Sequence, residues 1–163
     1  MRQVLDRVNI RPKKEFGQNF LVDGGVLERE VAYAHVSRTD VVLEIGAGIG
    51  NLTELLLQRA GRVVAAEADR QFEKRLGELQ AEYDNLEIIW GDALEVEFPT
   101  FDKVVANLPY KVALPLTFKL LDCKFVRGVL IYQKRLAQRI CATAGQNGYS
   151  RLAVSVNRRA NAE

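Results

Sequence analysis

The sequence predicts an α/β fold in which a mostly parallel sheet carries helices on both faces. From residue 41 onward, short runs rich in Val and Ile alternate with longer amphipathic stretches, as in strand-helix-strand units. Several of these runs are followed at once by glycine or polar residues, as expected where parallel strands end at a common edge. The 163 residues, 48% hydrophobic and 27% charged, suit one soluble domain with a substantial core.

The five apolar runs predict strands at residues 41–45, 62–66, 86–90, 103–106 and 128–132. A sixth strand is predicted at residues 152–156. Apolar side chains at helical spacing predict helices at residues 25–35, 51–60, 70–82, 116–121 and 134–142. Residues 1–15 are predicted to form a basic arm, and residues 16–163 form the domain itself.

Cysteine, histidine and hydropathy exclude several classes of protein. Cys123 and Cys141 have no neighbouring Cys or His, so we expect buried thiols rather than metal ligands or a disulfide framework. The one histidine, His35, falls near the end of a predicted helix, where we expect a capping or half-buried role rather than catalysis. Because there is neither a membrane-length apolar run nor a secretory signal, we expect a cytoplasmic protein without a membrane partner.

The charges are segregated along the chain. Residues 16–123 are acidic overall, whereas residues 124–162 carry eight basic side chains and no carboxylate. Residues 1–15 are also basic. A block of cations without acids is typical of a surface that binds a polyanion, which makes nucleic acid a candidate partner. A solvated basic face without a partner is the alternative.

A glycine-rich turn follows the first predicted strand, with glycines at Gly46, Gly48 and Gly50. Glycines here allow a sharp turn and a close approach of ligand to backbone. A dinucleotide fingerprint requires its third glycine at position 51, where this chain has Asn51, so nicotinamide and flavin cofactors are disfavoured. An acidic residue followed by glycines at alternate positions is typical of methyltransferases that use S-adenosylmethionine.

Carboxylates follow the next two predicted strands. Glu67 lies 21 residues after Gly46, where a carboxylate can accept hydrogen bonds from both ribose hydroxyls. Asp92, after the third strand, is placed to accept a bond from an adenine amino group. Either residue alone is more often a surface carboxylate, but together with the glycine turn they predict one adenosine-containing cofactor.

The fourth predicted strand is followed by Asn107, Leu108, Pro109 and Tyr110. The amino group of adenine is a weak nucleophile, and two acceptors on its hydrogens favour the pyramidal, reactive geometry. The Asn107 side-chain oxygen and the Leu108 carbonyl are candidates for these acceptors. Pro109 would fix the backbone, and Tyr110 would stack on a base taken out of its helix or loop. A proline turn with a packing tyrosine is the structural alternative.

With these motifs the sequence resembles the S-adenosylmethionine-dependent ribosomal RNA adenine N6,N6-dimethyltransferases of the small subunit, and most of all archaeal members. The resemblance covers nearly the whole chain and lies in residues 13–21, 42–53, 88–94, 104–110, 115–121 and 149–154. It implies a Rossmann-like class I methyltransferase fold, a metal-free reaction and a monomer. It also implies small-subunit ribosomal RNA, or a pre-30S-type particle, as partner during ribosome biogenesis.

The same resemblance implies roles for individual residues. Gln18, Asn19 and Leu21 would close over the methionine end of the cofactor, and Phe20 is a candidate second wall for the base. The rest of the cofactor site would consist of Gly46, Gly48, Glu67, Asp92 and Asn107. Asn107 and Tyr110 would also form the acceptor site for adenine.

The chain departs from the family pattern at two places. The family usually has Ile-Ser-Ser-Pro where this chain has Val112, Ala113, Leu114 and Pro115, so both serine hydroxyls are replaced. Loss of the hydroxyls bears on whether one or two methyl groups are added. Members of the family also continue beyond Glu163 with a last antiparallel strand and a helical domain that grips RNA. We therefore expect a C-terminally truncated core that binds cofactor better than it methylates ribosomal RNA.

Three other functions are compatible with parts of the sequence. A large-subunit adenine methyltransferase of the antibiotic-resistance type shares the Gln-Asn-Phe-Leu and Asn-x-Pro-Tyr elements, although residues 115–119 favour the small-subunit branch. A non-catalytic RNA-binding assembly factor would explain Ala113 and Leu114 but not the intact Asn107 and Tyr110. A small-molecule methyltransferase would leave the basic ends unexplained.

Overall fold

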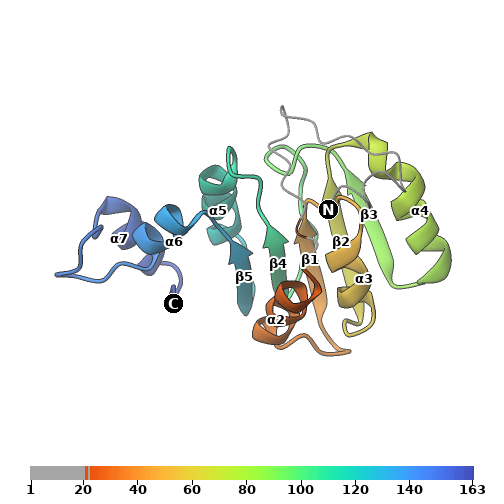
Figure 1. The fold of residues 1–163 in the computed structure, drawn as a ribbon, viewed down its shortest axis with the longest axis horizontal. Helices are drawn as coiled ribbons and strands as arrows, with labels where there is room; N and C mark the ends of the chain where they lie inside the picture. Colours follow the sequence, from red (N-terminus) through yellow and green to blue (C-terminus); the bar gives the residue numbers. More distant parts are fainter. Residues whose placement is uncertain (1–20, 22) are drawn as a thin grey trace.

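The computed structural model describes residue 21 and residues 23–163. Five strands form one sheet in the order β3-β2-β1-β4-β5, and all four neighbouring pairs are parallel (Figure 1). The strands are β1 (Val41–Ile45), β2 (Arg62–Glu67), β3 (Leu86–Trp90), β4 (Lys103–Asn107) and β5 (Arg127–Ile131). The five predicted strands are confirmed, each end within one residue of its prediction. The predicted arm, residues 1–15, lies outside the described residues.

Helices cover both faces of the sheet, as predicted. On one face, α2 (Gly24–Ala34), α3 (Asn51–Leu57) and α4 (Glu73–Glu82) pack through buried leucines against Val42, Val63 and Val105. A short 3-10 helix, η2 (Arg70–Phe72), precedes α4. On the other face, α5 (Ala113–Leu121) and the loop after β3 pack against Leu43, Ile45 and Val104. The alternation of side chains along each strand thus divides the core into two layers.

Local signals in the sequence explain where α2 and α5 begin and end. Asp23 caps α2, because its Oδ1 accepts from the backbone N–H groups of Gly25 at 2.9 Å and Val26 at 3.2 Å. The helix ends at His35, which has the left-handed conformation (φ 51°) and confirms the expected capping position. The α5 helix begins at Ala113, three residues before the predicted start, with Pro115 in its first turn, where a missing N–H costs nothing.

The predicted sixth strand is wrong, because residues 151–157 form a helix, α7 (Arg151–Asn157). The helix buries Ala153 and Val156, three residues apart, whereas a strand would bury alternate residues. A short apolar run does not distinguish these two periods, and the valines at 154 and 156 favoured the strand interpretation. The preceding helix α6 (Lys134–Ile140) packs against α7, and both lie beyond β5 (Figure 1).

The order of the strands locates the position where ligands bind in this class of fold. The chain leaves β1 through α3 on one face of the sheet and leaves β4 through α5 on the other. Since β1 and β4 are neighbours, their connections diverge at the carboxyl edge. This is the topological switch point of an open α/β sheet.

Candidate active site

The glycine turn lies at this switch point, between β1 and α3. Gly46, Gly48 and Gly50 all have positive φ angles, of 80°, 54° and 82°. A Cβ on Gly50 would lie 2.6 Å from Leu79 Cδ1, so Gly50 is required by packing. A Cβ on Gly46 would meet no atom of the described residues within 4 Å, so among these residues its missing side chain opens onto space beside the strand end. The turn therefore combines a packing glycine with a glycine that leaves room for a ligand.

The N–H groups of the three glycines all have partners inside the protein. Gly46 donates to the Ala66 carbonyl at 2.8 Å, and Gly50 donates to the Ala47 carbonyl at 2.9 Å. Gly48 donates to Glu67 Oε2 at 2.8 Å. These N–H groups are thus not available to a pyrophosphate, which agrees with the spacing argument against dinucleotides.

Polar side chains near the ends of β1, β2 and β4 share one face of the sheet. Side chains alternate between the two faces of a strand, so each residue shares its face with the residue two positions before it. For Glu44, Glu67 and Asn107, that earlier residue belongs to the core layer beneath α2, α3 and α4. Parallel pairing brings the three strand ends to the same edge. The edge therefore presents two carboxyls and an amide beneath α2 and α3, in an otherwise apolar layer.

Glu67 is buried and joins the glycine turn to the end of β2. Its Oε1 accepts from the Asp69 N–H at 2.8 Å while Oε2 accepts from Gly48. Burial raises the pKa of Glu67, and the hydrogen bonds from Asp69 and Gly48 oppose that rise. Each carboxylate oxygen keeps a further lone pair for a ligand hydroxyl.

Glu44 and Glu30 are two further buried carboxyls in the same layer. Burial, with the Glu67 and Glu30 carboxylates nearby, raises the pKa of Glu44 to about 8. Glu30 projects from α2, and burial raises its pKa to about 7. Among the described residues, Glu30 Oε1 and Glu44 Oε2 have no partner within hydrogen-bond geometry, and the Thr53 hydroxyl, which also has none, is near enough to Glu44 to oppose the rise in its pKa. Unpaired buried acceptors are costly, and they favour a ligand that brings cationic or hydroxyl donors.

Asn107 ends β4 and forms one hydrogen bond within the described residues. Its Nδ2 donates to Glu30 Oε2 at 3.3 Å. Its Oδ1 is buried and has no partner within the described part of the chain. The amide oxygen is therefore the end of this side chain that remains available to a substrate.

The turn after β4 carries the rest of the predicted acceptor motif. Leu108 is buried in the α5 layer, and the Pro109 carbonyl accepts from the Val112 N–H at 3.0 Å. Tyr110 is 43% exposed, so its ring is accessible from solvent. Ala113, at a position where the family usually has serine, is buried in the core at the start of α5.

Asp92 is exposed in the loop after β3. Its Oδ1 accepts from the Leu94 N–H at 2.8 Å, which forms a local turn, and Gly91 bonds back to the Glu67 carbonyl at 2.9 Å. This bond fixes the ends of β2 and β3 side by side. Nearby, the Arg70 guanidinium lies over the Trp90 ring at 4.7 Å.

Leu21 packs against the α2–α3–α4 core layer. Gln18, Asn19 and Phe20, the other residues predicted to lie over the cofactor, fall outside the described residues. Sequence reasoning did not assign Glu30, although the sequence held a signal for it. Glu30 lies three residues after Leu27, on the apolar face of the predicted helix, where a charged residue requires an explanation.

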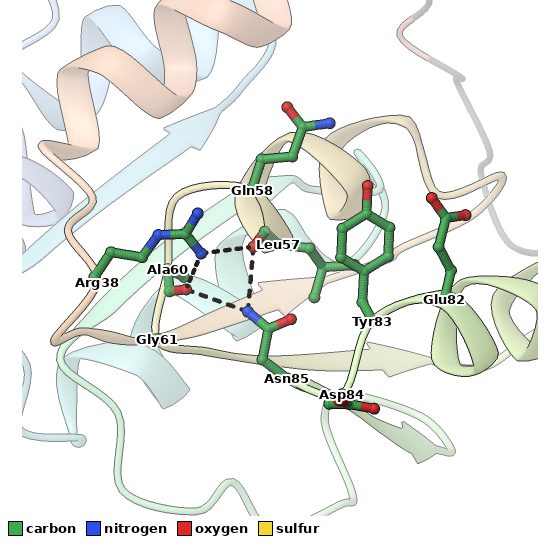
Figure 2. Close-up of a pocket in the computed structure, with 9 residues that line it drawn as sticks. All are labelled: Arg38, Leu57, Gln58, Ala60, Gly61, Glu82, Tyr83, Asp84 and Asn85. Atoms are coloured by element: carbon green, nitrogen blue, oxygen red, sulfur yellow. Dashed lines mark hydrogen bonds between the residues drawn. The ribbon is translucent and has the colours of Figure 1, made fainter.

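An open cavity of about 620 Å³ lies at the opposite edge of the sheet, where β2 and β3 begin. Figure 2 shows Arg38 and Asn85 reaching into it and donating to the carbonyls of Leu57 and Ala60 at the end of α3. These bonds satisfy carbonyls that the helix leaves unpaired. The cavity is therefore a helix-capping feature and not part of the candidate site.

The described residues contain no cluster of three or more His, Cys, Asp or Glu side chains arranged to hold a metal ion. Cys123 and Cys141 are free and only partly buried, so the expectation of fully buried thiols is wrong. No helix within the described range is long and apolar enough to cross a membrane.

Comparison with known proteins gives matches to one family and to several of its members. Residues 9–163 match the family described as ribosomal RNA adenine dimethylase. The chain is 46% identical over 162 residues to a probable ribosomal RNA small subunit methyltransferase A of Thermococcus sibiricus. It is 50% identical over 154 residues to the protein of that description in Methanosarcina mazei. These matches cover 98% and 94% of the chain but 58% and 56% of the two relatives, so the chain spans little more than half their length.

Solved structures give the same result. A dimethyladenosine transferase from Plasmodium falciparum superposes with a TM-score of 0.79 at 39% identity, covering 85% of this chain and 52% of that one. The 23S rRNA methyltransferase ErmE superposes with a TM-score of 0.73 at 28% identity, covering 83% of this chain and 56% of that one. The predicted Rossmann-like methyltransferase fold is thus confirmed.

Proposed function

We propose, since the chain belongs to the ribosomal RNA adenine dimethylase family, that it transfers methyl groups from S-adenosylmethionine to N6 of adenines in small-subunit ribosomal RNA. The observation that carries this proposal is the set of acceptor oxygens at the switch point, ending in the unpaired Oδ1 of Asn107. The family match supplies the substrate class, and the site geometry is compatible with it.

The residues of the site fit the proposed cofactor. S-adenosylmethionine carries an ammonium group, two ribose hydroxyls and an adenine amino group, all of them hydrogen-bond donors. The edge offers acceptors for such donors at Glu67, Asp92 and the unpaired Glu44 Oε2, while Gly46 leaves open space beside them. We assign Glu67 to the ribose and Asp92 to the adenine, with Gly46 and Gly48 forming the wall of the site.

The methionine end of the cofactor is assigned to Gln18, Asn19, Leu21 and Asn107. Leu21 is the only member of the first three that lies in the described residues, and it packs against the α2–α3–α4 core layer. These roles come from the resemblance of residues 13–21 to the family.

On the acceptor side, Asn107 Oδ1 and the Leu108 carbonyl would each accept a hydrogen bond from the adenine amino group. These hydrogen bonds favour a pyramidal nitrogen, whose lone pair is no longer conjugated with the ring and is available for attack. Pro109 holds the turn, and the exposed ring of Tyr110 stacks on the base. When bound, S-adenosylmethionine supplies a methyl group on a sulfonium sulfur, and the protein contributes alignment and hydrogen bonds.

We assign RNA binding to the basic segment, residues 124–162. All eight basic side chains of residues 124–162 lie on exposed residues, and four of them lie on α6 and α7. Arg159 lies 3.8 Å from the carboxylate of Asp122. Exposed cations on such a surface neutralise phosphates and release counterions. The partner would be small-subunit RNA or a pre-30S-type particle, bound by a monomer in the cytoplasm, where such particles are assembled.

The experiment measures transfer of tritium from labelled S-adenosylmethionine to small and large ribosomal subunits in parallel. We expect label in adenines of the small-subunit RNA and its loss in Asn107→Ala. Label confined to large-subunit RNA would favour the activity that the ErmE structure is named for. Cofactor binding by calorimetry without label in either RNA would favour a non-catalytic assembly factor.

A further inference from the structure

Glu30 is a buried carboxyl that the proposed function does not yet use. It lies on the inward face of α2 with Leu27, Val31 and Ala34, and only 4% of its surface is exposed. The other buried residues of α2 are all apolar. Burial of a carboxyl in such surroundings costs several kcal/mol of folding free energy unless it has a partner, so its position calls for a physical reason.

The side chain of Asn107 provides that reason. Glu30 Oε2 accepts from Asn107 Nδ2 at 3.3 Å, and this is the hydrogen bond that joins α2 to the end of β4 at the site. An asparagine amide has a donor end and an acceptor end, which its neighbours must distinguish. A carboxylate only accepts, so an ionised Glu30 selects the NH₂ end and leaves Oδ1 for another partner.

We propose that Glu30 is a positioning residue that orients the amide of Asn107 so that Oδ1, and not the NH₂ group, faces the amino group of the substrate adenine. The proposal rests on the proposed function, because it assumes that Asn107 receives a hydrogen of the reacting nitrogen. In this assignment Glu30 acts on the substrate through Asn107 by way of its Oε2, and the positioning role does not depend on what Oε1 binds.

The protonation state of Glu30 then controls the acceptor site. A protonated carboxyl can donate its O–H to Asn107 Oδ1, and the amide can rotate to present its NH₂ group, which cannot accept from adenine. Burial places the pKa of Glu30 at about 7, so ionisation occurs near neutral pH. The oriented state exists above that pH and is lost below it.

The nearby carboxyls leave this ionisation to Glu30. The pKa of Glu44 on β1 is about 8, above that of Glu30, because burial and the negative charges of Glu67 and Glu30 raise it. Glu44 is therefore still protonated when Glu30 ionises. From β4, Asn107 supplies the hydrogen bond, while Lys103 at the other end of the strand is paired with Asp40 at 2.8 Å. On α2 itself, Glu28 and Arg29 are exposed.

Two substitutions at Glu30 separate positioning from a structural role. Glu30→Gln keeps an acceptor for Asn107 but does not titrate, whereas Glu30→Leu removes the acceptor and any buried charge. Glu28→Gln, on the exposed side of the same helix, is the control. Because Glu30→Leu replaces a buried carboxyl with an apolar side chain of similar size, we expect it to fold at least as stably as the parent chain.

The first readout is the pH dependence of tritium transfer to small-subunit RNA. In the parent chain we expect kcat to fall below pH 7, about tenfold per pH unit, as a required base is protonated. We expect Glu30→Gln to lose this dependence, and Glu30→Leu to lower kcat about tenfold or more at all pH values with KM for RNA little changed. A pH profile in Glu30→Gln identical to that of the parent, or full kcat in Glu30→Leu, would overturn the proposal.

The second readout does not require activity. In the chain labelled with 15N, we expect the side-chain NH₂ signals of Asn107, assigned through Asn107→Ser, to titrate with a midpoint near pH 7 and to stop titrating in Glu30→Gln. Constant signals in the parent chain would contradict the inferred contact. If these signals titrate but no RNA is labelled, the proposed function fails while the positioning contact stands.

Discussion

Replacing Gly46 with alanine tests whether the open space at the glycine turn is a ligand site. Gly46 has a φ of 80°, and a Cβ there meets no atom within 4 Å in the part of the chain that the structure describes. The substitution therefore adds backbone strain without a clash. If the space receives the cofactor, the new methyl group will occupy part of it.

The structure gives the size of each effect. A left-handed conformation costs a non-glycine residue about 1–2 kcal/mol, so Gly46→Ala should reduce the free energy of unfolding by that amount. Gly77, inside α4, also has free space around its Cβ position but no positive φ, and Gly77→Ala should gain about 0.5–1 kcal/mol. The affinity of Gly46→Ala for S-adenosylmethionine should fall at least about tenfold, or 1.4 kcal/mol.

The assay combines urea denaturation with calorimetric titration of S-adenosylmethionine. We expect Gly77→Ala to bind the cofactor like the parent chain, whereas Gly46→Ala is folded but binds weakly. Binding by Gly46→Ala within twofold of the parent value would refute the placement of the cofactor beside Gly46.

Three further predictions concern charge and stacking. Hydrogen bonds from Lys103 and Ser37 outweigh burial and lower the pKa of Asp40. The ionised Asp40 therefore stabilises the fold above pH 4, and this contribution is lost on acidification. Asp40→Asn should remove that loss, as measured by urea midpoints at pH 3 and 7. Because the pKa of Glu44 is raised to about 8, the folded chain holds a proton there that the unfolded chain has lost, and the free energy of unfolding falls as the pH rises from 5 to 8. Glu44→Gln should make this fall shallower by about 1.4 kcal/mol for each pH unit. Tyr110→Ala should lower RNA methylation about tenfold or more, by loss of about 1–3 kcal/mol of stacking, while Tyr110→Phe retains it in the same assay.

The fold was largely predictable because parallel strands are buried on both faces and read as unmistakable apolar runs. The error at residues 152–156 arose where this signal is weakest. That run is short, and its buried pair, Ala153 and Val156, has helical spacing. Strand propensity of valine was overridden by packing of α7 against α6.

The candidate site was predictable only where it follows strand ends. Gly46, Glu67 and Asn107 lie at the expected edge because parallel strands end together. The contact between Glu30 and Asn107 was not predictable, because it depends on how α2 crosses the sheet, and helical periodicity gives the buried face but not its neighbours. The assignments of Gln18 and Asn19 stay predictions.

Mass spectrometry of nucleosides tests the central claim most directly. Small-subunit RNA is incubated with the chain and S-adenosylmethionine carrying a deuterated methyl group, and then digested. The assignment of Asn107 and its neighbours predicts N6-methylated adenosine with the label, singly or doubly substituted, and none with Asn107→Ala. Labelled adenosine in equal amount with Asn107→Ala would contradict it.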